Sequence, residues 1–178
     1  MTTSKATLKY IDDEDRCYGL TGMAMGIVIW DCEELLAAIN LDADPDEMME
    51  FTPQFYFAGN PKISARIAWN QILEHYRLSM GLMMANVLCR NYVHSNKQVE
   101  SDTITLMRKY LLDEGRETCS LDEDEVNALF NKQFSYLERL FNHPGVRQVA
   151  NDFARDLSHR RRMTVSEVIE GFRPLALL

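Results

Sequence analysis

The chain of 178 residues lacks a hydrophobic run long enough to cross a bilayer, which requires about 20 apolar residues. The longest uncharged candidate, from Cys17 to Trp30, has 14 residues and is followed by acidic side chains. Glycine and proline together number only 13, which excludes collagen-like and low-complexity classes. The first ten residues lack the apolar core of a secretory signal, so we expect residues 1–10 to be a flexible N-terminus on a cytoplasmic protein that does not bind membranes.

The signature motifs of several enzyme classes are also missing. Neither G-x-x-x-x-G-K-[ST] nor G-x-G-x-x-G occurs, which gives no support for nucleotide binding through a glycine-rich loop. There is no G-x-S-x-G elbow for a hydrolase nucleophile. The four cysteines form no C-x-x-C pair, and we interpret them as reduced thiols in the core. We therefore expect no cofactor and no catalytic residues, and favour a protein without enzymatic activity.

The charge of the chain has one predominant sign. Its 19 basic and 27 acidic side chains leave a net charge of -8, which gives no general attraction for nucleic acid or an anionic membrane. All of the acidic excess is in residues 1–60, where the net charge is -9, against +1 in residues 61–178. This asymmetry indicates either an acidic surface that faces a partner or local accumulation at helix starts.

Apolar residues recur at helical spacing along most of the chain, and no segment alternates as a strand bounded by hairpin turns. The pattern predicts an all-α single domain, a bundle of five or six helices around one long central helix. The central helix is expected over residues 62–94. At about 1.5 Å per residue its length exceeds the diameter of a domain of this size, so it must bend, protrude or contact a second subunit.

A first helix is expected over residues 12–41, although Gly19, Gly22 and Gly26 lie inside it. Each glycine costs about 0.5–1 kcal/mol relative to alanine in a helix interior. Either these small residues allow another helix to approach closely, or the helix kinks or breaks near Gly19 to Gly22.

Capping signals and helix breakers divide the rest of the chain. Residues 43–60 are expected to be a connection with one short helical turn near 46–50. Its aromatic residues either bury their rings or grip a ligand or partner; they are Phe51, Phe55, Tyr56 and Phe57. One further helix is expected over residues 101–114, with its end at Gly115, and the next begins after a capping box of Ser120 and Glu123. Another is expected from Pro144 onward, and the last over residues 165–172, after a capping box of Thr164 and Glu167.

The second half of the central helix has twelve consecutive uncharged residues, 78–89. A helix that is apolar on all sides has to be covered on all sides, either by the other helices of the chain or by a second copy. We expect a homodimer through Met80, Met83, Met84 and Val87. The leading hypothesis is thus a protein that acts by association, with itself or with an unidentified protein partner.

A second hypothesis is a helical bundle that binds a metal or a small apolar ligand in its interior, with or without enzymatic activity. Asp152, Asp156 and His159 lie at i, i+4 and i+7 on one helical face and are potential metal ligands. The alternative for this face is a solvated surface on which Arg155 pairs with the carboxylates.

A third hypothesis is weak nucleic-acid binding by a regulator through Arg160, Arg161 and Arg162, the densest basic cluster. Cations also accumulate at helix C-termini because they complement the helix dipole. Three arginines are a small footprint against a net charge of -8, so nucleic acid is not the partner we favour.

Overall fold

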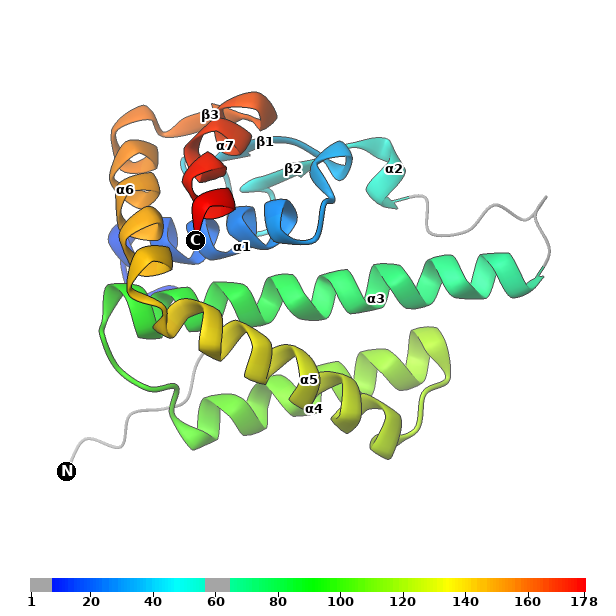
Figure 1. Ribbon diagram of the computed structural model, residues 1–178. Coiled ribbons are helices and arrows are strands. Elements are labelled where there is room, and N and C mark those ends of the chain that lie inside the picture. The colour runs from blue at the N-terminus through cyan, green and yellow to red at the C-terminus, as the bar shows by residue number, and fades with distance from the viewer. Residues whose placement is uncertain (1–7, 57–64) are drawn as a thin grey trace.

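The computed structural model describes residues 8–56 and 65–178, and most of the expected flexible N-terminus lies outside this range, as does Phe57. Within the described residues the fold is the expected all-α single domain, with a small sheet at one side (Figure 1). In chain order the elements are α1 (Asp13–Ile29), η1 (Glu33–Leu35), β1 (Leu36–Asn40), β2 (Met49–Phe51), α2 (Pro53–Tyr56), α3 (Ala65–Leu88), η2 (Cys89–His94), α4 (Ser101–Cys119), α5 (Glu123–Asn142), α6 (Pro144–Arg160), β3 (Arg162–Thr164), α7 (Val165–Phe172) and η3 (Arg173–Leu177).

The long helix α3 crosses the centre of the molecule, as Figure 1 shows, with α1 on one side and α4 and α5 on the other. Its last turns continue as the π-helical segment η2, so the expected end near His94 is confirmed. The sheet and α7 lie beyond α1, and α6 closes one end of the bundle. No described helix combines the length and the apolar character that a membrane crossing needs.

The first helix is shorter than expected. α1 ends at Ile29, and the prediction that it extends to residue 41 is wrong. Asp31 has a backbone φ of 52°, a left-handed conformation that stops an α-helix. Leu35 and Ile39 continue the helical spacing by chance, whereas Leu36 to Asn40 form a strand in which Leu36, Ala38 and Ile39 are buried.

The glycines of α1 are packing positions, and the helix is continuous through them. An added Cβ on Gly22 would lie 2.2 Å from the carbonyl oxygen of Ala85 on α3, which is far inside contact distance. Of the two explanations for these glycines, close approach of a second helix is therefore the one observed.

The three-stranded antiparallel sheet, with strand order β2-β1-β3, corrects the prediction that the chain has no strands. Ala38 on β1 lies opposite Glu50 on one side and Thr164 on the other. The strands have three to five residues, too short to show alternation, and β3 comes from the far end of the chain. The helical turn expected near 46–50 is also misplaced, because β2 begins at Met49 and the turn is α2.

The boundary between α4 and α5 lies later than the sequence indicates. Gly115 does not end α4. Instead, its missing side chain makes room for Tyr76, whose hydroxyl oxygen would lie 2.8 Å from an added Cβ. The helix continues to Cys119, and Ser120 caps it with φ 53. The capping box of α5 is formed two residues beyond the expected pair, by Asp122 and Glu125.

The end of the chain follows the prediction closely. Pro144 is the first residue of α6, where its missing N–H costs nothing. The expected capping box of Thr164 and Glu167 is present and opens α7 over Val165–Phe172.

Candidate functional site

The residues expected at a dimer contact lie mostly inside one chain. Met80 and Met84 have no exposed surface, and Val87 is 4% exposed, whereas Met83 is partly buried. Their helix, α3, packs against α1, α4 and α5. The uncharged half of α3 is thus covered by the chain's own helices, the first of the two alternatives that its composition allows.

Asp152, Asp156 and His159 do lie together along a surface hollow on α6. Each carboxylate already has an arginine partner, because Arg155 pairs with Asp152 and Arg160 with Asp156. Across residues 8–56 and 65–178, no group of three or more histidine, cysteine, aspartate or glutamate side chains is arranged to hold a metal ion. The geometry matches a solvated, ion-paired face.

The arginine cluster is neutralised within the chain. The ion pairs are Arg160 with Asp156 and Glu167, Arg161 with Asp13 and Asp42, and Arg162 with Glu50. Hydrogen bonds to the Asp13 and Asp42 carboxylates raise the pKa of Arg161. These contacts tie the end of α6 to the start of α1 and to the sheet, so the cluster serves the fold and presents no unpaired guanidinium to a phosphate.

A buried ion pair that the sequence analysis missed joins α1 to η2. Arg90 donates from Nε to Asp15 Oδ1 at 2.7 Å and from Nη2 to Asp15 Oδ2 at 2.5 Å. It also donates to the backbone carbonyls of Leu8 and Lys9, at 3.2 and 2.8 Å. Burial opposes ionisation of Asp15, but these charge-assisted hydrogen bonds outweigh it and lower its pKa. The sequence signal for this pair is Arg90 directly after the uncharged run, with an acidic cluster at the start of α1.

The cysteine thiols are poorly suited to nucleophilic chemistry. Burial raises the pKa of Cys17 to about 11 and that of Cys89 further still. Cys32 is half-buried, and burial together with nearby carboxylates also raises its pKa. At neutral pH these three groups are therefore thiols rather than reactive thiolates.

The expected aromatic connection is only partly buried. Phe51 and Phe55 stack with ring centroids 3.7 Å apart, and Phe55 also lies 4.6 Å from the ring of His75 on α3. Tyr56 is exposed. The rings therefore fix α2 against α3 and form one wall of a hollow there.

An apolar groove of about 710 Å³ lies between the end of α1, the last turns of α5, the start of α6 and the segment α7–η3. We call it the C-terminal groove. Its floor contains the buried Phe172 and Val146, and its walls contain the half-buried Ile29 and Leu140. Sequence spacing gives no sign of it, because its residues come from six separate elements.

Exposed apolar side chains project beside this floor. Ile169 is 42% exposed, Tyr136 38% and Leu178 61%. An added Cβ on Gly145 would lie 2.7 Å from Leu178, so the final turn is packed against the start of α6. The surface consequently offers a hollow and protruding apolar groups side by side.

Charges of both signs border the C-terminal groove and come from different elements. The acidic groups, Asp31 and Glu33, follow α1, whereas Arg139 and His143 are at the end of α5 and Arg173 opens η3. Arg173 pairs with Glu170, but Glu33 and Arg139 form no ion pair with any residue that the structure describes. The border can thus attract charged groups of either sign.

Comparison with other proteins adds no family: no family model matches the chain, and neither a curated protein nor a solved structure is significantly similar to it.

Proposed function

We propose that this protein acts by association rather than catalysis, as a cytoplasmic homodimer whose two copies meet through the C-terminal groove. The observation that carries the proposal is the groove itself, an apolar hollow with Ile169 and Tyr136 exposed beside it. Burying such side chains against a partner releases about 25 cal/mol for each Å² of apolar surface.

A second copy fits this surface because the surface is complementary to itself. In a two-fold dimer the same patch meets itself, so each protruding group must find a hollow and each charge an opposite charge. The groove supplies both, since Ile169 and Leu178 stand beside the floor, and Glu33 and Arg139 lie at its border. A two-fold axis through the groove can bring the acidic side of each copy to the cationic side of the other.

The contact is placed here rather than on Met80, Met84 and Val87 because those side chains are already buried within one chain. The cytoplasmic assignment is supported by the four cysteines, all of which are free. Their raised pKa values at Cys17, Cys32 and Cys89 support a role that does not use a cysteine nucleophile.

Light scattering and sedimentation equilibrium over a range of protein concentrations test the proposal. The wild-type protein is expected to form dimers that dissociate on dilution. Ile169→Arg places a charge in the apolar contact and is expected to raise the dimer dissociation constant at least about tenfold, a loss of about 1.4 kcal/mol.

Ile11→Arg is the matched control, since Ile11 is 81% exposed and lies outside the groove. This variant should dimerise like the wild type. A wild-type protein that is monomeric at every concentration, or an Ile169→Arg variant with unchanged association, would contradict the proposal.

A further inference from the structure

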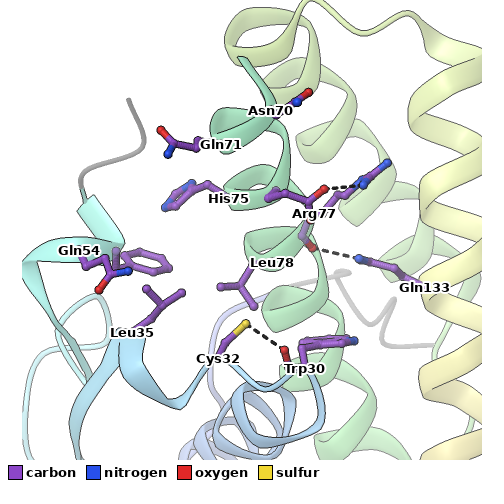
Figure 2. Close-up of a pocket in the computed structure, with 12 residues that line it drawn as sticks. Trp30, Cys32, Leu35, Gln54, Asn70, Gln71, His75, Arg77, Leu78 and Gln133 are labelled. Carbon is purple, nitrogen blue, oxygen red and sulfur yellow. Dashed lines mark hydrogen bonds and ion pairs between the residues drawn. The ribbon is translucent and has the colours of Figure 1, made fainter. Parts of the chain in front are cut away.

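A second hollow, separate from the C-terminal groove, lies between α2, α3 and the segment that follows α1. We call it the amide cleft, and its volume of about 640 Å³ is within the range of about 300–1,000 Å³ typical of small-molecule sites. Leu35, Leu78 and Cys32 lie low in the cleft, as Figure 2 shows. Apolar groups at the base and polar groups at the mouth are the usual arrangement of a ligand pocket.

The mouth of the cleft is lined by carboxamides. Gln71 and His75 point from α3 to the side on which Gln54 and α2 lie, whereas Asn70, which also lines the cleft, points to the other side of α3 (Figure 2). Gln54, Asn70 and Gln71 are exposed. Each carboxamide offers a donor and an acceptor in one plane, so these groups match a ligand whose edge carries both.

The walls of the cleft are held in place before any ligand arrives. Trp30 lies directly on α3, where an added Cβ on Gly81 would be 2.4 Å from the indole ring. The Cys32 thiol donates to the Trp30 carbonyl oxygen at 3.2 Å. Across the cleft, Phe55 is fixed between Phe51 and His75. A rigid cleft loses little conformational entropy on binding.

The electrostatic surroundings disfavour an anionic ligand. Arg77, the one arginine in the lining, pairs with Glu74 at 2.7 Å. Besides burial, the carboxylates of Glu34 and Glu33 raise the pKa of Cys32, which places negative potential at the base of the cleft. A phosphate group would therefore find repulsion and no unpaired arginine in the described lining.

We propose that the amide cleft binds an uncharged nitrogen heteroaromatic of the nucleobase or nucleoside class. A glutamine carboxamide can pair in bidentate fashion with the amine and ring nitrogen of adenine. The indole of Trp30 in the cleft lining suits a flat ring, because base–aromatic stacking contributes to binding whatever the base. Ligand binding here is independent of dimerisation through the C-terminal groove.

Isothermal titration calorimetry of the full chain with adenosine tests this site. We expect saturable binding of one adenosine per chain, and at least tenfold weaker binding of AMP because of its phosphate. Gln54→Leu and Gln71→Leu each remove a carboxamide from an exposed position and should weaken adenosine binding at least tenfold without altering the thermal unfolding of the protein.

Gln148→Leu is the matched control, because Gln148 is an exposed glutamine on α6 outside the cleft. Its affinity for adenosine should equal that of the wild type. The proposal is overturned if adenosine shows no saturable binding at millimolar concentration, if AMP binds as tightly as adenosine, or if the Gln54→Leu and Gln71→Leu variants bind like the control.

Discussion

The uncharged half of α3 and the C-terminal groove are both apolar surfaces, but the chain covers only the first. Met80 and Met84 on α3 are fully buried among neighbouring helices, whereas Ile169 and Tyr136 beside the groove remain exposed. The first surface is one continuous stretch of helix. The second is assembled from six elements and finished by the last turns of the chain. A long apolar run therefore identifies the core here, and the surface that we propose for a partner has no apolar run of its own.

The largest expected effect comes from removing the buried ion pair between Arg90 on η2 and Asp15 on α1. Arg90→Met leaves Asp15 as a buried carboxylate without its cation and releases the carbonyls of Leu8 and Lys9. We expect a loss of about 3–5 kcal/mol in the free energy of unfolding. Denaturant unfolding followed by circular dichroism measures it.

Arg155→Met is the control for that change, since Arg155 pairs with Asp152 on the exposed face of α6. An exposed ion pair contributes at most about 1 kcal/mol, so this variant should unfold nearly like the wild type. If the two variants lose equal free energy of unfolding, the buried pair of Arg90 and Asp15 stabilises the fold no more than the exposed pair does.

A pair of truncations compares the two apolar surfaces directly. Met84→Ala creates a cavity in the packed core and is expected to cost about 2–5 kcal/mol of stability. Ile169→Ala removes a partly exposed side chain and should change monomer stability by about 0.5 kcal/mol, while it weakens dimerisation. Unfolding and light scattering on both variants separate the effects. If Met84→Ala proves nearly neutral, the interpretation of the α3 surface as covered core is wrong.

These contrasts also explain how much of the fold could be predicted from the sequence. The helices with strong local signals were predicted well, such as α7, which Thr164 and Glu167 open. The sheet was missed because its strands are short and pair residues from opposite ends of the chain, such as Ala38 with Thr164. The sequence predicts a helix end at Gly115, but the actual role of this glycine, making room for Tyr76, depends on a tertiary contact that the sequence does not show.

The candidate sites were harder to predict than the fold. Arg160, Arg161 and Arg162 form a basic cluster in the sequence, but the acidic partners of Arg161 and Arg162 come from distant elements. Neither the C-terminal groove nor the amide cleft follows from spacing along one helix. Local patterns report local structure, and both hollows exist only once separate elements are packed together.

A smaller effect is expected from the charges at the border of the C-terminal groove. Glu33→Arg and Arg139→Glu each place like charges against each other across the proposed two-fold contact, and each should raise the dimer dissociation constant about tenfold. The double variant restores opposite charges and should recover most of the affinity. Sedimentation at low and high salt checks this, because screening should shrink the differences. Additive losses in the double variant would contradict the two-fold arrangement.

The smallest effect concerns the exposed ion pairs that lie outside both apolar surfaces. Hydrogen bonding to Arg161 lowers the pKa of Asp13 in the folded protein. A lowered pKa stabilises the fold above the unfolded value of about 4, and this contribution is lost as the pH falls through the folded value. Asp13→Asn should therefore be less stable than the wild type by at most about 1 kcal/mol at pH 7, with the difference vanishing in acid. Denaturant unfolding from pH 7 down to the acid transition measures the two curves. If the two curves of unfolding free energy against pH stay parallel through the acid range, Asp13 acts through packing rather than through its charge. The ion pair of Asp13 with Arg161 would then add no pH-dependent stability.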